Sequence, residues 1–389
     1  MADVVAYPRN VGELATAIRL AHQHRVPVTP RGQGTGNYGQ AIPLRYGLVI
    51  DTTRCDRIHE IGDGWIKVEA GTSFVTIEAA ARRYGQEIAI MPSTVGSALG
   101  GFIAGGAGGI GSIENGWIWD EFVHALDIAP CTDDGELVEV TGADCRPLLH
   151  AYGVSGVIAT ATVALVPARD WTAALASFPS EPTALEAGRR LMALDPPPRL
   201  VSLDEPGLVA LFPRDPAMPL GRFSLRAIID SSTLQAATSA IAACGGLVEV
   251  VRPKGAAYLG SLSFNHTTYR ARRARAELCH LQVGGDALVD HAEEVRTVLP
   301  RTLLHFDGFR VHRPGPADPI AGRGFVGLLL CRFNGAEALY TGVDRLRELG
   351  VQVEDPHTWL LRHNLDAIRE TARRFDPDGL LNPGKLPPA

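Results

Sequence analysis

Cysteine is scarce in this sequence and is never arranged for metal binding. The six cysteines are spread over 389 residues, without a CxxC motif or a Cys/His cluster at zinc spacing. We therefore expect reduced thiols and no metal site. The N-terminal residues lack both the basic and the apolar region of a signal peptide, which favours a cytoplasmic protein.

Basic blocks and long apolar runs are also missing. The formal net charge is −6, and the most basic run, residues 270–275, has the spacing of a solvated helix face. This pattern argues against a nucleic-acid partner. The longest apolar-looking segment, residues 98–113, is nearly half glycine and too short for a membrane span, so none is expected.

Glycine, by contrast, is concentrated in two segments. The first lies between strand-like residues 26–30 and 47–51. Glycine permits positive φ and removes the Cβ, so the backbone N–H groups of such a loop can surround a phosphate; a mobile surface loop is the alternative. The candidate ligand-binding residues here are Pro30, Arg31, Gly32, Gln33, Gly34, Thr35, Gly36 and Asn37.

Two common nucleotide-binding motifs do not fit this loop. The sequence has no GxxxxGK[ST], which excludes a P-loop. The spacing of Gly32, Gly34 and Gly36 differs from the dinucleotide fingerprint, and a strand follows where that motif requires a helix. The loop therefore predicts another kind of phosphate cradle.

The second glycine-rich segment covers residues 93–109. A helix starting near Ser97 would offer free N–H groups to an anion, and small side chains would let a ligand lie close. Tight internal packing is the alternative. Two such segments in one chain favour one long phosphate-bearing ligand. The candidates in this segment are Pro92, Ser93, Thr94, Gly96, Ser97, Gly100, Gly101 and Ala104.

Periodicity predicts the remaining elements of the first half. An amphipathic helix is expected near the N-terminus, followed by alternating short strands and helices of an α/β pattern. A proline after the last of these strands, Pro167, indicates a domain edge. The expected helices are 10–24 and 76–84, and the expected strands are 65–71, 86–91, 122–130, 135–140 and 153–167.

These motifs resemble, in order and spacing, the FAD domain of vanillyl-alcohol-oxidase-type flavoproteins, also called the PCMH-type domain. The resemblance covers residues 1–168 and 375–389, since residues 375–385 look like the family's C-terminal signature. It implies an α+β fold: a two-subdomain FAD-binding domain (1–168, completed by 375–389) and a substrate-binding cap of antiparallel sheet and helices (169–374).

The resemblance also implies roles for the motifs. Both glycine-rich segments would hold the FAD pyrophosphate, and the turn at Asn382 would lie near the isoalloxazine. The backbone of Gly156, Val157 and Ile158 would lie along the adenine and ribose.

The chain departs from the family's covalent flavin members at two positions. Those members carry His where this loop has Thr35, and the bicovalent ones carry Cys near Ser93. Neither nucleophile is present, so non-covalent FAD is expected. Because covalent attachment generally raises the flavin's oxidising power in such families, its absence favours ordinary alcohol or hydroxy-acid dehydrogenation.

The middle of the chain repeats a strand–helix–strand pattern. This predicts an antiparallel sheet with helices on one face. The expected helices are 182–194, 234–244 and 336–349, and the expected strands are 221–230, 247–251, 325–332 and 351–353.

Three side chains in this region are candidates for chemistry. His266 could remove a hydroxyl proton while hydride leaves for flavin N5; alternatively, Asn265 and Thr267 there cap a helix. His357, in a loop after the last strand, could act as the base or be a surface histidine. Arg226 could clamp a substrate carboxylate or lie exposed on its strand.

The expected function is an FAD-dependent oxidoreductase acting on a small or medium organic alcohol or hydroxy acid. The electron acceptor, whether oxygen, a quinone or a protein, is left open by the sequence. Two alternatives also stay open: an FAD-binding subunit of a redox complex with no turnover alone, and a biosynthetic tailoring enzyme that acts on a larger metabolite.

Overall fold

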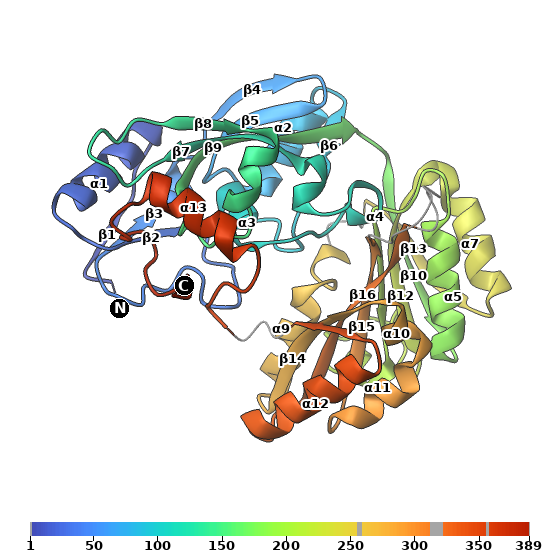
Figure 1. Cartoon of the computed structure of the whole chain (residues 1–389). Helices are drawn as coiled ribbons and strands as arrows, with labels where there is room; N and C mark the ends of the chain where they lie inside the picture. The colour runs from blue at the N-terminus through green and yellow to red at the C-terminus, as the bar shows by residue number, and fades with distance from the viewer. Residues whose placement is uncertain (1, 255–258, 312–321, 355–357, 389) are drawn as a thin grey trace. The chain divides into compact units, whose positions relative to one another are not determined.

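The computed structural model describes residues 2–254, 259–311, 322–354 and 358–388, which form two compact units (Figure 1). The first unit comprises residues 1–108, 117–168 and 357–389, and the second comprises 109–116 and 169–356. One division follows Ala168, next to Pro167. Two further divisions, at 108/109 and 116/117, place residues 109–116 in the second unit, although the sequence predicts them in the FAD domain. The last division lies at 356/357, since helix α13 (Leu365–Phe375) packs against the η3 segment (Gly142–Leu148) of the first unit.

A three-stranded parallel sheet starts the first unit. Its order is β1 (Val4–Ala6), β3 (Leu48–Asp51), β2 (Val28–Arg31). Helix α1 (Val11–Gln23) precedes β2, and the Asn10 side chain caps it by accepting a hydrogen bond from the Glu13 N–H. The predicted N-terminal helix and the two strands around the glycine loop are therefore confirmed.

A six-stranded antiparallel sheet forms the rest of this unit. It follows the path β4-β5-β9-β7-β8, and β6 pairs with β9. The β7–β8 hairpin is as predicted, whereas helix α2 begins and ends two residues before its predicted bounds. The bounds are β4 Ile58–Gly62, β5 Trp65–Glu69, α2 Phe74–Arg82, β6 Gln86–Ile88, α3 Leu99–Gly105, β7 Val123–Ala129, β8 Val138–Thr141 and β9 Val157–Pro167.

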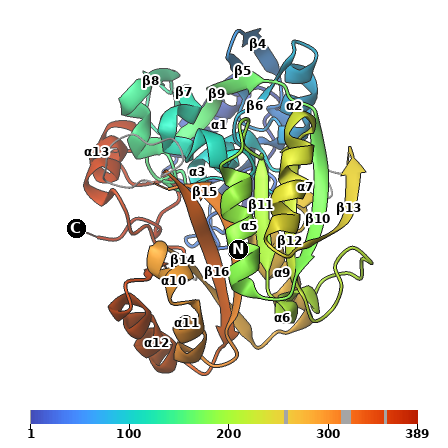
Figure 2. The same cartoon turned by 90° about the vertical axis from the view of Figure 1, so that its right-hand side faces the viewer.

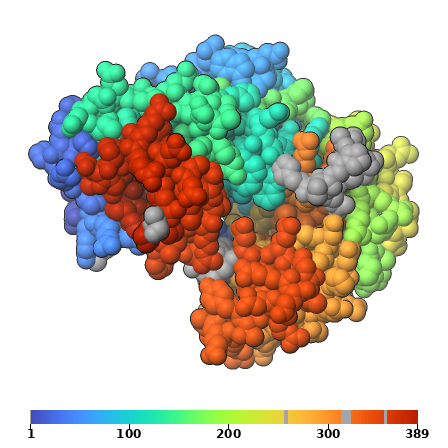
Figure 3. Space-filling view, in the orientation of Figure 1, coloured from blue at the N-terminus to red at the C-terminus, as the bar shows by residue number. Residues whose placement is uncertain are grey.

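The C-terminal segment completes the first unit. Leu381 forms a parallel bridge with Val28 of β2, and the Val28 N–H donates to the Leu380 carbonyl at 2.8 Å. In the space-filling view the red C-terminal residues lie against the green residues that follow β7, consistent with the contact between α13 and η3 (Figure 3). The last residues thus return to the strand that leads into the glycine loop.

The second unit is built on an eight-stranded antiparallel sheet. The strand order is β13-β10-β12-β11-β15-β16-β14-β17. Strands β10, β11, β14 and β15 are additions to the predicted set. The bounds are β10 Trp171–Phe178, β11 Leu200–Asp204, β12 Phe223–Asp230, β13 Leu247–Pro253, β14 Leu278–Gly284, β15 Leu303–Arg310, β16 Arg323–Arg332 and β17 Gln352–Glu354.

Helices pack their apolar residues on one face of this sheet, as predicted. Figure 2 shows α5 and α7 in front of its strands. Helices α6 (Pro206–Val209) and α9 (Asn265–Ala274) also contact strands of the sheet but contribute nothing to this main core among the described residues. The helices of the main core are α5 Glu181–Met192, α7 Leu234–Ala243, α10 Asp286–Asp290, α11 Ala292–Val298 and α12 Ala336–Glu348.

Two further observations concern the cysteines and the helices. All six cysteines are buried free thiols. None of the helices in the described part of the chain combines the length and the hydropathy that a bilayer crossing demands.

Candidate functional site

The glycine loop leaves strand β2 at Arg31 and is anchored at its start. A Cβ on Gly32 would lie 2.8 Å from the Cβ of Ala98, so only glycine allows this approach to the second glycine-rich segment. Gly34 has a φ of 68°, which favours glycine. The residues from Gln33 to Asn37 are then exposed, and their backbone is accessible to a ligand.

Hydroxyl groups join the loop to the second glycine-rich segment. The Thr35 and Ser97 hydroxyls are 2.7 Å apart, and Ser97 is also 2.6 Å from the Thr94 hydroxyl. Ser93 and Ser97 are buried, and Pro92 is half-buried. Two segments whose contacting residues, Thr35 and Ser97, are 62 positions apart in the sequence are therefore adjacent in the first unit.

The glycines of the second segment divide into two kinds. A Cβ on Gly100 would lie 2.6 Å from the Ala70 Cβ, so this glycine serves internal packing. Gly96 and Gly101 have no heavy atom within 4 Å of the Cβ position, so open space lies over their backbone. Helix α3 starts at Leu99, later than the predicted Ser97, and Ala104 near its end is half-buried.

The predicted adenine segment opens strand β9. Gly156 has a φ of 140°, and Val157 and Ile158 are buried in two different apolar cores. Their side chains are therefore occupied, which leaves only the backbone of this segment for a ligand contact.

Asn382 is a buried connection between three segments. Its side-chain N–H group donates to the Gln40 carbonyl at 2.9 Å and to the Tyr152 carbonyl at 2.7 Å. Its backbone N–H donates to the Val28 carbonyl at 2.6 Å. Asn382 thus fixes the end of the glycine loop against the turn that precedes Gly153.

Two further polar residues of the first unit, His150 and Lys385, are not among the candidates that the sequence predicts. His150 has a φ of 53°, and its Nδ1 lies 2.8 Å from the Gly106 carbonyl; burial lowers the pKa of His150 to about 4. Lys385 is fully buried, and its ammonium donates to the Gly39 carbonyl at 2.5 Å. Lys385 is the last residue of the C-terminal motif, but the burial of both side chains depends on segments distant in sequence.

In the second unit, His266 lies in the first turn of α9 and is half-buried. Burial, aided by the Arg270 charge, lowers the pKa of His266, so the neutral ring prevails at pH 7. The capping alternative is wrong: the helix is capped by Phe264 without a side-chain hydrogen bond, and the buried Thr267 hydroxyl has no partner among the described residues.

The structure differs from both expectations for Arg226, a carboxylate clamp and an exposed strand residue. This arginine is fully buried rather than exposed, and its guanidinium pairs with Asp204 and donates to the Ser224 hydroxyl. A carboxylate clamp needs two parallel N–H donors facing a pocket. Because both terminal nitrogens are engaged within the core, we do not retain Arg226 as a substrate ligand.

Arg226 instead belongs to a closed charge cluster with Asp204, His305 and Asp307. The His305 ring nitrogens lie 2.9 Å from Asp204 and 2.6 Å from Asp307. Burial lowers the pKa of His305, but the two carboxylates outweigh it and raise that pKa to about 10. Asp307 also accepts the backbone N–H of Phe264, two residues before His266. The cluster therefore fixes the segment that leads into α9.

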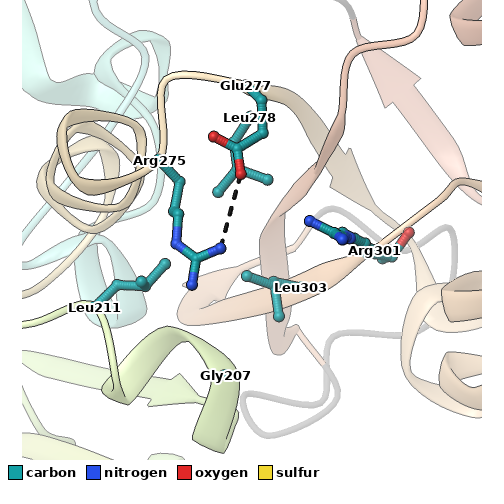
Figure 4. A pocket seen from close by; sticks show the side chains of 8 residues that line it. Gly207, Leu211, Arg275, Glu277, Leu278, Arg301 and Leu303 are labelled. Atoms are coloured by element: carbon teal, nitrogen blue, oxygen red, sulfur yellow. Dashed lines mark ion pairs between the residues drawn. The ribbon is translucent and has the colours of Figure 1, made fainter.

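A small cavity of about 230 Å³ also lies in the second unit (Figure 4). Leucines and an ion pair between Arg275 and Glu277, at 3.7 Å, line it beside Arg301. Neither His266 nor Arg226 is among its lining residues. His357, the remaining catalytic candidate, lies outside the described residues.

Comparisons with known proteins address the first unit most directly. Residues 2–141 match the family model described as an FAD binding domain. The D-lactate dehydrogenase of Archaeoglobus fulgidus is 28% identical over 206 residues, which are 49% of this chain and 46% of that protein. The glycolate oxidase subunit GlcD of Bacillus subtilis is 29% identical over 177 residues, covering 43% and 37%.

A third similar protein is the D-2-hydroxyglutarate dehydrogenase of Escherichia coli, 36% identical over 144 residues, which are 35% of this chain and 14% of that protein. The matches span less than half the length of each of these three relatives. A solved alkyldihydroxyacetonephosphate synthase has a similar fold, with a TM-score of 0.74 and 15% identity, over 97% of this chain and 76% of that chain. The expected α+β fold is thereby confirmed.

Proposed function

Through residues 2–141 the chain belongs to the PCMH-type FAD-binding proteins, and on that premise we propose that it is an FAD-dependent oxidoreductase acting on hydroxy acids. The names of three similar proteins support the donor class: D-lactate, D-2-hydroxyglutarate and glycolate all carry a hydroxyl group beside a carboxylate. Bound FAD would accept the hydride from the hydroxyl-bearing carbon. The protein's part is to bind both molecules and to remove the hydroxyl proton.

The observation that carries this proposal is the joined pair of glycine-rich segments. The exposed loop backbone, the hydroxyl contact between Thr35 and Ser97, and the open space over Gly96 and Gly101 fit a diphosphate that approaches the main chain closely. A Cβ at either glycine would enter that space. These residues are the ones we propose to hold the FAD pyrophosphate.

We propose non-covalent attachment. A covalent bond to the flavin ring needs a nucleophilic side chain such as His or Cys, and the corresponding positions hold Thr35 and Ser93. The Thr35 hydroxyl lies within hydrogen-bonding distance of Ser97, and Ser93 is buried. Neither group is an activated nucleophile.

We propose His266 as the base. Its lowered pKa leaves the ring neutral at pH 7, which is the form that accepts a proton. The Asp307 contact to the Phe264 N–H holds the residues just before it. His357 is retained as a second candidate on its sequence position alone.

The first test is a visible absorption spectrum of the purified protein, repeated on the supernatant after acid precipitation. Yellow protein whose colour moves to the supernatant supports dissociable flavin, whereas colour in the pellet contradicts it. Anaerobic mixing with D- and L-lactate, glycolate and D-2-hydroxyglutarate then reports bleaching of the flavin band. A colourless protein that fails to take up added FAD would refute the proposal.

A second candidate function is an FAD-binding subunit of a redox complex. The name of GlcD, a glycolate oxidase subunit, favours it, because that protein is similar over 43% of this chain. Tight FAD uptake without bleaching by any hydroxy acid would favour this reading over an enzyme that turns over alone.

A further inference from the structure

Lys385 carries a buried positive charge without a counter-ion. No part of its surface is exposed, and its ammonium donates to the neutral Gly39 carbonyl. Among the described residues, no carboxylate forms an ion pair with it. An ammonium removed from water is unfavourable unless a negative charge compensates it. Burial alone accordingly lowers the pKa of Lys385 to about 8.

The acidic groups on the elements packed around the C-terminal tail form no ion pair with Lys385 among the described residues. They are Asp366 and the exposed Glu370 on α13, and Asp376 and Asp378 after it. The partners of the aspartates are Arg369 for Asp366, the Leu380 and Leu381 N–H groups for Asp376, and His22 and Arg25 for Asp378. Arg369 also donates to the Pro387 and Pro388 carbonyls. None of these four carboxylates pairs with Lys385, whose ammonium contacts the Gly39 carbonyl.

The ammonium is directed at the proposed cofactor loop. Gly39 lies near the end of the first glycine-rich segment, and the next residue, Gln40, is held by Asn382, three positions before Lys385. The uncompensated charge and the proposed FAD cradle therefore share one stretch of backbone. FAD is the anionic ligand that this unit is proposed to bind.

We propose that Lys385 is the counter-ion for an anionic group of bound FAD. This inference rests on the proposed FAD-binding function. Two parts of FAD offer the same chemistry: the pyrophosphate, which is anionic throughout, and the ring system, which gains negative charge on reduction or when an anion adds to N5. In either case the anion restores a favourable environment for the protonated amine.

The proposal predicts a linked protonation. Pairing with an anion raises the pKa of Lys385 above its value of about 8 in the free protein. Above pH 8, binding of the anionic group then takes up a proton, and the affinity falls by up to about tenfold per pH unit. Below that pH the amine is already protonated, so this group imposes no pH dependence.

The experiment uses the full chain freed of flavin. Affinities for FAD and for ADP are measured between pH 6.5 and 9.5 by calorimetry in two buffers of different ionisation enthalpy, which reports proton uptake. Sulfite affinity of the FAD-loaded protein is measured over the same range, because sulfite adds to flavin N5 and leaves negative charge on the ring. Lys385→Met is compared with Lys67→Met, whose lysine is half-buried and paired with Asp127.

If the pyrophosphate is the partner, Lys385→Met weakens FAD and ADP binding by about tenfold or more and abolishes proton uptake in both. If the ring is the partner, ADP binding is unchanged, and the same losses are found for sulfite. Lys67→Met should leave the affinities for all three ligands and the proton uptake unchanged. The flavin-free Lys385→Met protein should unfold no more readily than the parent at pH 7, because the change removes an uncompensated buried charge.

The inference is overturned if the parent binds FAD but takes up no proton above pH 8 in all three titrations, with FAD, ADP and sulfite. This result needs no variant. Affinities of Lys385→Met within about twofold of the parent for all three ligands overturn it as well. Failure of the parent to bind FAD would instead refute the proposed function on which the inference rests.

Discussion

At the scale of single residues, the second unit is marked by a buried cluster whose charges balance. Asp204 and Asp307 oppose Arg226 and a protonated His305, and each group is almost entirely removed from water. In such a cluster the loss of one partner is costly, because the remaining charge stays buried.

Asp204→Asn should therefore lower the free energy of unfolding by about 3–5 kcal/mol, because it leaves Arg226 and His305 with one fewer anion. Urea denaturation checks this. Asp344→Asn is the matched control, since it breaks an exposed pair with Arg347 on α12 and should change stability by less than about 0.5 kcal/mol. Equal effects of the two changes would contradict the role of the cluster.

His305 should also make stability depend on pH. Its pKa in the folded protein is raised to about 10, so its stabilising protonation is complete below its ordinary pKa of 6.5 and is lost as the pH rises through 10. Lys385, with a lowered pKa, acts in the opposite direction above pH 8. Glu205, whose pKa burial raises to about 8, lowers stability in the same direction up to that pH. Between pH 6.5 and 8 stability should therefore fall with pH in the parent, and the less steep fall in His305→Gln gives the contribution of His305.

His266 is the residue on which the proposed chemistry depends. His266→Ala should slow flavin reduction by a hydroxy acid by about 10²–10⁴-fold while leaving FAD bound, since the base acts on the donor. Anaerobic stopped-flow absorbance measures this rate. His291→Ala is the control, because His291 is a half-exposed histidine of the same unit. An unchanged rate in His266→Ala would move the role to His357 or to another group.

At the scale of elements, adjacent glycines of α3 have opposite surroundings. Gly100 is closed in by Ala70, whereas Gly101 faces open space. The two alternatives considered for this segment, internal packing and ligand approach, therefore apply to different residues of one short helix. This difference allows stability and cofactor binding to be tested separately.

Gly101→Ala should weaken FAD binding yet raise the free energy of unfolding of the flavin-free protein by about 0.5–1 kcal/mol, because alanine favours the helix. Gly100→Ala should instead destabilise the fold, since its Cβ would lie 2.6 Å from that of Ala70. Thermal unfolding and fluorescence titration with FAD measure the two quantities. Unaltered FAD affinity in Gly101→Ala would count against the proposed cradle.

At the scale of the whole molecule, the first unit is assembled from three stretches of chain, the last of which returns from beyond the second unit in sequence. The tail bonds to β2 through Val28, and Asn382 holds the glycine loop. The second unit includes no residue of this tail. The C-terminal tail therefore holds strand β2 and the glycine loop, which are parts of the proposed FAD site, in position.

Removal of residues 376–389 should consequently disturb the first unit alone. We expect loss of FAD uptake and loss of hydrogen-exchange protection at the Val28 amide, whose acceptor is the Leu380 carbonyl. Exchange in β12 and β15 of the second unit should be unchanged. Mass-spectrometric exchange measures all of these, and a tail-deleted protein that still binds FAD tightly would contradict this dependence.

Much of this protein is determined locally by its sequence. Helix periodicity, the glycine segments and the hairpin turn act over a few residues, so α1, α5, α7, α12 and the strands around the glycine loop were predictable. The motifs that resemble an FAD domain are local in the same sense, and the family match over residues 2–141 covers the two glycine-rich ones. Strand β10, whose residues are buried on both faces, lacks the alternation that would have revealed it.

Only the tertiary structure decided which polar residues are buried and what they meet. Arg226 is an ordinary strand arginine in sequence, and its burial depends on Asp204, 22 positions away, and on a strand that carries His305. The contact between Thr35 and Ser97 and the burial of Lys385 against Gly39 likewise join distant segments. Desolvation and charge pairing arise from the packed neighbours of a side chain, which no local pattern specifies.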